Sequence, residues 1–439
     1  MPAESEEIWR YSGIDDFELA RFAPVGTGGA PATRSGSLLD ALASARATAD
    51  RIGPRSLLVV TLDGSVVAIE AGAGAVEGLS VSVASPTLAG APDQAATSPG
   101  SLLDAGEWVE EALGSVAGVD DAFGALHDTF LADVVALHLV SGADVADPVV
   151  VAHLVDPAPV GGLGPSAFPR TVVRLGAGAR GTVVELTVSW PGDGMSAGEG
   201  SAPGALVVPV TELDVADGAY LAYANVQVLD LASTQIALQA SRVARDGELR
   251  SFAVVAGGRY ARLRTDAAAV GTGAHSALLA AFLGVEDQVL DFRTRQEHIA
   301  AHTTSELLFK GAVADTARSV YSGLIQIRPG ARKTSAVQTN HNLVLSEGAR
   351  ADSVPNLDIE ENDVRCSHAS TVGPVDEEQR YYLESRGIEP PVAERLVVAG
   401  FFADLAARCP VPGVGRWLQE IAGERLTASR LVGSGADRG

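Results

Sequence analysis

The chain has 439 residues, a hydrophobic content of 46% and a formal net charge of −23 at pH 7, which is enough length for two or three domains around a large buried core. The acidic excess disfavours nucleic acid and anionic membrane surfaces as partners, because binding to either depends on clustered Lys and Arg. No apolar run approaches the ~20 residues that span a bilayer, and the first residues lack the pattern of a signal peptide. We therefore expect a cytoplasmic protein.

Cysteine and lysine are both scarce. Cys366 and Cys409 are the only cysteines, and Lys310 and Lys333 are the only lysines. Two thiols are too few for a disulfide framework and too few to hold a metal–sulfur cluster alone. A cluster bound here would need ligands from another chain.

Residues 1–135 read as a separate region of mixed helix and strand. Residues 37–52 have helical apolar spacing, and residues 57–69 predict a hairpin with Asp63-Gly64 at its turn. The composition further predicts helices over about 102–113 and 122–135, and a mobile connection over 84–100. Nothing in this region indicates a chemistry.

Residues 136–372 consist of short apolar runs broken by Gly-Ala turns. Five of these Gly-Ala pairs begin at Gly178, Gly218, Gly273, Gly330 and Gly348. Their separations of 40, 55, 57 and 18 lie near multiples of roughly 18–20 residues, the expected span of one solenoid coil. The pattern predicts a right-handed parallel β-helix core, although Gly-Ala pairs also recur by chance in a chain with 48 glycines. Residues 192–204 are predicted to form a protruding loop.

Residues 373–430 predict a helical domain, followed by a disordered tail over 431–439. Asp376 should cap a first helix, a second should run from Val392 to Arg408 after two prolines, and a short third should contain Trp417. The apolar stripe of the second helix consists of Val392, Leu396, Ala399, Phe401, Phe402, Leu405 and Ala406. Packing against the solenoid and docking of another protein both remain open for this stripe.

Cys366-Ser367-His368 is the strongest candidate for a ligand pair. In an extended strand, residues two apart project from one face, so the thiol and the imidazole would point the same way. Two ligands fall short of the four that a closed metal site needs. His298 and His302 have i, i+4 spacing, which is weaker evidence for a metal pair. Upstream of Cys366, residues 342–345 and 357–359 predict short strands, with turns at Gly348 and Pro355.

The order and spacing of residues 333–388 are specific. The residues concerned are Lys333-Thr334, Gln338-Thr339-Asn340, Asn342-Leu343, Asp352, Pro355, Leu357, Ile359, Asp363-Val364, Cys366-Ser367-His368, Thr371-Val372-Gly373, Asp376-Glu377-Glu378, Tyr382-Leu383 and Ser385-Arg386-Gly387-Ile388. This stretch resembles the C-terminal core of the SufB/SufD family, scaffold proteins of SUF iron–sulfur cluster assembly, and is most like the D type. Weaker matches lie at Thr303, Ser305, Lys310-Gly311, Gly323 and Ile325, and near the N-terminus at 7–12. His341, Asp358 and Ala369-Ser370 depart from the family pattern without removing a candidate ligand.

The resemblance implies a non-catalytic scaffold that pairs with a SufB-like solenoid subunit and a SufC-like ABC-type ATPase. A nascent iron–sulfur cluster would form transiently at the shared interface, with none held tightly by the isolated chain, which can also form a homodimer. Family resemblance places Cys366 and His368 at the end of the solenoid, and we expect His368 ahead of Cys366 to contact iron. B-type chains carry the thiolates on which sulfur lands, so the low cysteine count favours the D type.

The resemblance also implies that the C-terminal helices dock the ATPase. The residues expected to take part are Arg386, Phe401, Phe402 and Leu405. The chain itself has no Walker A motif or other catalytic signature in a supporting context.

A β-helix enzyme acting on carbohydrate is the alternative from another class. Such enzymes need aromatic stacking surfaces and paired carboxylates. An aromatic content of 5% and scattered acidic residues make that function less favoured. Co-purification with an ATPase and a second solenoid would favour the scaffold, whereas glycan cleavage would favour the enzyme.

Overall fold

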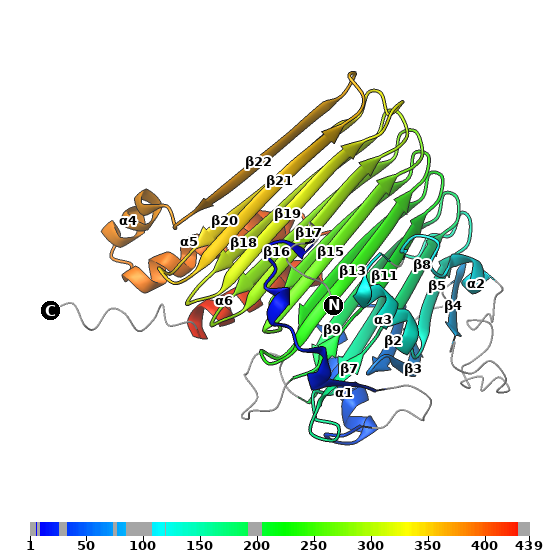
Figure 1. Cartoon of the computed structure of the whole chain (residues 1–439), viewed down its shortest axis with the longest axis horizontal. Helices are drawn as coiled ribbons and strands as arrows, with labels where there is room; N and C mark the ends of the chain where they lie inside the picture. Colours follow the sequence, from blue (N-terminus) through cyan, green and yellow to red (C-terminus); the bar gives the residue numbers. More distant parts are fainter. Residues whose placement is uncertain are drawn as a thin grey trace.

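The computed structural model describes residues 6, 9–25, 33–72, 77–84, 108–118, 120–191 and 204–428. This part of the chain is mainly β and forms a parallel β-solenoid of about seven turns, with an N-terminal α/β part and C-terminal helices (Figure 1). None of its helices is long and apolar enough to cross a membrane. The connection expected over 84–100, the loop over 192–204 and the tail over 431–439 lie almost entirely outside the described residues.

Two sheets form the walls of the solenoid. From the last strand inward, the first sheet contains β21 (Arg350–Ile359), β19 (Arg318–Ile327), β17 (Val289–His298), β15 (Tyr260–Ala269), β13 (Thr234–Val243), β11 (Val210–Val215), β8 (Arg170–Leu175), β5 (Val134–Leu139) and β4 (Leu79–Ala84). The second contains β22 (Arg365–Gly373), β20 (Ser335–Val344), β18 (Thr304–Val313), β16 (His275–Gly284), β14 (Glu248–Val255), β12 (Tyr220–Val228), β9 (Arg180–Ser189), β6 (Val149–Val155), β2 (Leu57–Leu62) and β3 (Ser65–Ala71). Three short strands, β1 (Phe22–Pro24), β7 (Gly164–Ala167) and β10 (Leu206–Val207), attach to the first sheet.

Each coil of the solenoid supplies one strand to each sheet. Val289 pairs with Tyr260 in the coil before it and with Arg318 in the coil after it, so these coils repeat every 29 residues. The predicted period of 18–20 residues is therefore wrong. Gly218 and Gly273 lie two coils apart, because Asp246 occupies the equivalent turn position between them with φ 53°. Aspartate tolerates this left-handed conformation better than most residues, so a search for glycine passed over that coil.

Consecutive turns are joined by hydrogen bonds along the solenoid. The amide of Gly218 donates to the carbonyl of Arg245, that of Asp246 to Thr272, and that of Gly273 to Ala301, at 2.8, 3.0 and 3.3 Å. The left-handed residue of each turn thus directs its N–H at the next coil. This satisfies backbone donors that a loop would otherwise leave to water.

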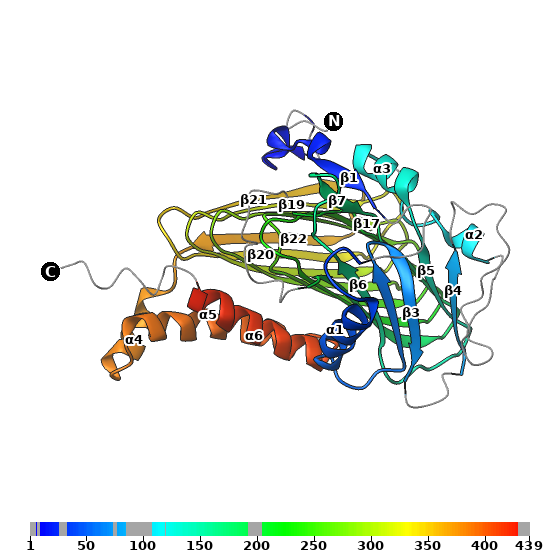
Figure 2. The same ribbon diagram turned by 90° about the horizontal axis from the view of Figure 1, so that it is seen from below.

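Alternating side chains fill the space between the sheets. In the later coils this interior contains a stack of aromatic rings formed by Phe282, Phe292, Phe309 and Tyr321. The outer face of the second sheet is apolar as well, and it is covered by α1 (Leu38–Asp50), α5 (Pro390–Ala407) and α6 (Pro412–Ala428) (Figure 2). The first residues described and α3 (Ala122–Phe130) lie on the opposite side of the solenoid (Figure 2).

The N-terminal elements join the same sheets. The hairpin of β2 and β3 and the helix α1, capped by Ser37, confirm the sequence predictions. The predicted helix over 122–135 is wrong at its end, because α3 (Ala122–Phe130) stops early and Val134 begins β5, in register with Arg170. α2 (Trp108–Ala112) is a single short helix. Because β2, β3, β4 and β5 are strands of the two sheets, the described strands before residue 140 belong to the same sheets as the solenoid.

As far as residue 428, the C-terminal region contains three helices. Asp376 caps α4 (Glu377–Ser385), its carboxylate accepting from the amides of Glu378 and Gln379 at 2.9 and 3.2 Å. The second predicted helix forms as α5, but it begins at Pro390 and includes both prolines, whereas the predicted start was Val392. The expected short last helix is longer than predicted, because α6 has 17 residues. α5 and α6 pack together against the second sheet.

Candidate functional site

The solenoid ends at two strands that lack a neighbour on one side. β21 pairs only with β19, and β22 only with β20, among the strands that the structure describes. Pro355 lies inside β21, so the predicted turn at this proline is wrong. The amides of Arg350 and Glu360 donate to carbonyls in or beside β19. The even-numbered residues of β21 therefore direct their N–H groups toward β19, and the odd-numbered residues direct theirs toward the free edge. The missing N–H of Pro355 therefore falls on the free edge, where a sheet tolerates proline.

The apolar interior is uncovered at this end. Ile325 and Ile327 of β19 are fully buried, whereas their register partners on β21, Leu357 and Ile359, are 38% and 44% exposed. Val372 on β22 is 46% exposed. Each of these side chains would be buried if one more coil followed. The last coil of the solenoid thus leaves interior apolar side chains exposed to solvent.

Cys366 and His368 lie on the interior side of β22. Cys366 pairs with Ala336 and His368 with Gln338, and both partners are buried inside the solenoid. Paired residues of neighbouring strands share a face, so the thiol and the imidazole project from the same face, as the spacing predicted. Cys366 is half-buried against Ile325, Ile327, Ala331 and Ala336, and burial raises the pKa of its thiol. His368 is exposed at the open end.

Behind this pair, β20 directs three amide side chains into the interior. Gln338, Asn340 and Asn342 are each at most 4% exposed. Asn342 Nδ2 donates to Asn340 Oδ1 at 2.6 Å, whereas neither amide atom of Gln338 has a hydrogen-bond partner within the described part of the chain. No role was predicted for these residues from the sequence. Their spacing could have indicated one, because amides at every second position of a strand place polar groups where an apolar interior is expected.

The other candidate ligands are structural. His298 is the last residue of β17, so the helical spacing inferred with His302 is wrong. Its ring nitrogens lie 2.8 Å from Thr303 Oγ1 and 2.8 Å from Ser305 Oγ, and burial lowers its pKa to about 4. Cys409 is buried beside α5, and burial raises the pKa of its thiol to about 12. Across the described ranges, no three His, Cys, Asp or Glu side chains converge to hold a metal ion.

A groove of about 1080 Å³ lies where α4 and α5 meet the end of the second sheet. Its lining is largely apolar with an acidic margin, and it consists of Leu343, Pro374, Asp376, Glu378, Gln379, Tyr382, Leu383, Leu396, Val397, Gly400 and Phe401. The guanidinium of Arg386 lies 5.1 Å from the centre of the Tyr382 ring. Phe401 and Tyr382, the residue beside Arg386, therefore lie on one accessible surface.

Phe402 and Leu405 lie elsewhere. Phe402 is 1% exposed and Leu405 is fully buried, and both pack in the core formed with α6 and the second sheet. This corrects the prediction that these two side chains dock another protein, because neither can contact a partner while α5 stays in place. Of the two alternatives left open for the apolar stripe, Phe402 and Leu405 thus pack against the solenoid and α6.

Comparisons with known proteins agree with the geometry. The family model described as "SUF system FeS cluster assembly, SufBD core domain" matches residues 160–401. An iron–sulfur cluster assembly SufBD family protein of Mycobacterium tuberculosis is 38% identical over 214 residues, covering 46% of this chain and 52% of the relative. The iron–sulfur cluster assembly protein SufD of Escherichia coli is 32% identical over 214 residues, covering 49% and 51%.

SufD of Bacillus subtilis is 38% identical over 151 residues, which cover 34% of this chain and 35% of the relative. The chain thus spans about half the length of the first two relatives and a third of the last. The match of the family model is broader, because it covers more than half of the 439 residues and includes Cys366 and His368. The chain therefore belongs to the SufB/SufD family, and it is SufD-like.

Proposed function

We propose that this chain is a non-catalytic scaffold subunit of a SUF iron–sulfur cluster assembly complex. In this proposal it pairs with a SufB-like solenoid subunit and a SufC-like ATPase, and a nascent cluster is built at the interface between the two solenoids. The cluster is the cargo of the complex. Membership of the SufB/SufD family and the relatives named as assembly proteins support the proposal.

The open end of the solenoid is the observation that carries the proposal. It combines two free strand edges with exposed apolar interior residues, which together suit the addition of another solenoid. His368 and Cys366 lie on the interior side of this end. Two side chains cannot complete the usual shell of four ligands around iron, so a partner would supply the rest.

His368 is better suited than Cys366 to bind iron first. Its imidazole is exposed at the open end, and a neutral imidazole is a common metal ligand at cytoplasmic pH. The thiol of Cys366 is half-buried and its raised pKa disfavours the thiolate that binds metal. Contact with iron would lower that pKa, so Cys366 can still serve as a second ligand.

The groove beside α4 and α5 is the proposed docking surface for the ATPase. Apolar side chains with an acidic margin suit an amphipathic partner segment that carries basic residues. Tyr382, Leu396 and Phe401 are the central contacts, with Arg386 at the side of Tyr382. Phe402 and Leu405 hold α5 in position beneath this surface.

Co-expression with the SufB-like and SufC-like subunits of the same cell tests the shared site. We expect His368→Ala to leave the complex assembled but to remove most of its iron and acid-labile sulfide, and Cys366→Ser to remove less. Ser367→Ala is the matched control, because Ser367 is adjacent but projects from the opposite face of β22. Full cluster content in the His368→Ala complex would show that this imidazole is not a ligand.

A further inference from the structure

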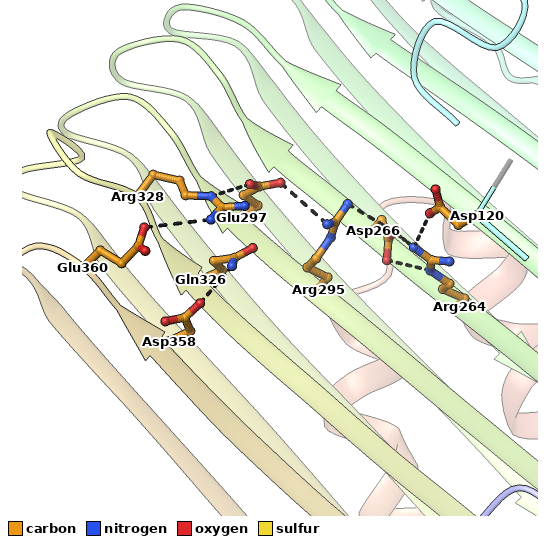
Figure 3. Close-up of polar contacts among 9 residues, drawn as sticks. All are labelled: Asp120, Arg264, Asp266, Arg295, Glu297, Gln326, Arg328, Asp358 and Glu360. Atoms are coloured by element: carbon orange, nitrogen blue, oxygen red, sulfur yellow. Dashed lines mark hydrogen bonds and ion pairs between the residues drawn. The ribbon is translucent and has the colours of Figure 1, made fainter. Parts of the chain in front are cut away.

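Polar side chains on the outer face of the first sheet bond to one another (Figure 3). Arg328 lies 2.7 Å from Glu297 and 3.8 Å from Glu360. The amide of Gln326 on β19 donates to Asp358 on β21 at 2.8 Å. This half-buried amide thus has a partner within the chain, although water could also reach it. A fully buried amide on the following strand, β20, has none.

That amide belongs to Gln338, which lies inside the solenoid at 0% exposure. Neither its amide oxygen nor its amide nitrogen has a hydrogen-bond partner within the described chain. Two other interior amides each use one group: Gln296 Nε2 donates to Ser305 Oγ at 2.8 Å, and Asn342 Nδ2 donates to Asn340 Oδ1 at 2.6 Å. Because a buried amide without a partner destabilises a fold, Gln338 calls for a role outside the packing of the core.

Gly323 of β19 provides the space that the amide of Gln338 occupies. A Cβ atom on residue 323 would lie 2.4 Å from Gln338 Nε2 and 2.4 Å from the hydroxyl of Tyr321, closer than a Cβ atom can approach. The hydroxyl already lies 3.0 Å from Thr294 Oγ1. The amide of Gln338 therefore lies over a glycine, and no hydrogen bond fixes its orientation there.

His368 is the residue of the next coil that lies directly beside Gln338. The two are register partners on β22 and β20, and both project from the interior face. Neighbouring strands lie about 4.8 Å apart, a distance that a glutamine side chain can cross by rotation about its own torsions. Cys366, by contrast, lies beside the apolar Ala336. The unpaired amide is thus next to the imidazole of the candidate ligand pair and not next to the thiol.

We propose that Gln338 is a positioning residue for His368: its amide oxygen accepts a hydrogen bond from Nδ1–H of the imidazole, so that Nε2 keeps its lone pair for iron. A histidine that binds a metal through one nitrogen commonly donates a hydrogen bond from the other, which fixes the tautomer and the orientation of the ring. Nδ1 is the nitrogen nearer to the backbone of β22, so it is the one that a side chain from β20 reaches.

The tautomer of His368 tests this bond in the isolated chain without iron. With ¹⁵N-labelled histidine at alkaline pH, the NMR signals lost in His368→Ala identify the ring, and we expect the shifts of a ring protonated at Nδ1. Gln338→Met keeps the length of the side chain but removes the acceptor, so it should shift the ring toward the Nε2–H form that neutral histidine prefers in water. Gln338→Glu retains an acceptor oxygen and should keep the Nδ1–H form. A wild-type ring protonated mainly at Nε2, or a tautomer unchanged in Gln338→Met, would overturn the inference.

Gln326→Met is the matched control. It makes the same substitution on the preceding strand, but the amide of Gln326 bonds Asp358 on the outer face, so the tautomer of His368 should not change (Figure 3). The melting temperature separates positioning from a structural role. Because no other side chain or backbone group of the described fold bonds the amide of Gln338, Gln338→Met should melt at the wild-type temperature or above it. A clear loss of melting temperature would contradict the inference, because it would show that the amide supports the fold.

The assembled complex tests what the bond does for the cargo, and this arm rests on the proposed function. Loss of a hydrogen-bond partner behind a metal ligand typically weakens metal binding by about 10- to 100-fold, so the Gln338→Met complex should lose iron to a chelator about tenfold faster than wild type. Gln338→Glu and Gln326→Met should stay close to the wild-type rate. Equal rates in Gln338→Met and wild type would contradict a role for Gln338 at the cluster. Full cluster content in His368→Ala would instead overturn the proposed function and leave the tautomer result, which involves no iron, unaffected.

Discussion

Lys310 of β18 and Asp404 of α5 form an ion pair, with Nζ 2.6 Å from Oδ1. The same ammonium group donates to the carbonyl of Phe401 at 3.0 Å and lies 4.8 Å from the centre of the Phe401 ring. Three contacts around one compact charge suit lysine, because a planar guanidinium would distribute its donors differently. This contact fastens α5 to the solenoid in a chain that otherwise uses arginine almost throughout.

Replacing this lysine should loosen the C-terminal helices. We expect Lys310→Met to lower the free energy of unfolding by about 1.5–3 kcal/mol, the range for hydrogen bonds to a charged group, and to speed hydrogen exchange in α5 and α6. Lys333→Met is the matched control, because Lys333 is 60% exposed and pairs with an exposed Asp363. If the two substitutions lower the free energy of unfolding in urea equally, the burial of Lys310 does not contribute to stability.

Acid should destabilise the fold through His298. Burial lowers its pKa from 6.5 to about 4, so below pH 6.5 the unfolded chain binds the proton more tightly than the folded one. The stability associated with this residue is present above pH 6.5 and is lost as the pH falls toward 4, by about 3 kcal/mol. We expect His298→Gln to be less stable than wild type at pH 7 but to lose less stability between pH 7 and pH 4.5.

The control for that measurement is His302→Asn, which removes an exposed imidazole from the adjacent turn while keeping a residue that tolerates its φ of 60°. Its urea unfolding should follow the wild-type pH dependence. If His298→Gln and wild type lose the same stability over this interval, the buried imidazole does not titrate as its environment indicates.

The groove and the core beneath it should respond differently to substitution. Tyr382 is 56% exposed and lines the groove, so Tyr382→Asp should reduce co-purification with the SufC-like ATPase while leaving the melting temperature unchanged. Tyr381→Asp is the matched control, because Tyr381 is 72% exposed on the same helix but does not line the groove. Undiminished ATPase recovery with Tyr382→Asp would show that the partner binds elsewhere.

Phe402→Ala should instead destabilise the chain by about 3–5 kcal/mol, the usual cost of truncating a buried phenylalanine. Its effect on the ATPase would then follow from loss of the folded helix. A normal unfolding curve for Phe402→Ala would contradict the packing of α5 described here.

Local signals in the sequence predicted local structure well. The Asp63-Gly64 turn, the helix predicted over 37–52 and the Asp376 cap each depend on neighbouring residues in the sequence, and all three form. The solenoid class was also predictable, but its period was not. Asp246 and His302 adopt the left-handed turn conformation that glycine adopts in other coils, so glycine spacing alone could not locate every coil.

The candidate site was predictable only in part. Strand alternation placed Cys366 and His368 on one face, because that relation is set by the backbone alone. Which side of α5 would be buried was not predictable, since its apolar stripe is wide and the second sheet and α6 compete for it. The side-chain amides of β20 that point into the solenoid, including that of Gln338, can be recognised as unusual only when the interior face of the strand is known.

The most direct measurement of the shared site is pulsed EPR of the reduced cluster in a complex in which only this chain carries ¹⁵N-labelled histidine. We predict a ¹⁵N hyperfine coupling from a histidine ligand that disappears in His368→Ala. A cluster that shows no such coupling, or one whose coupling persists in His368→Ala, would contradict the assignment of His368 as the ligand that this chain contributes.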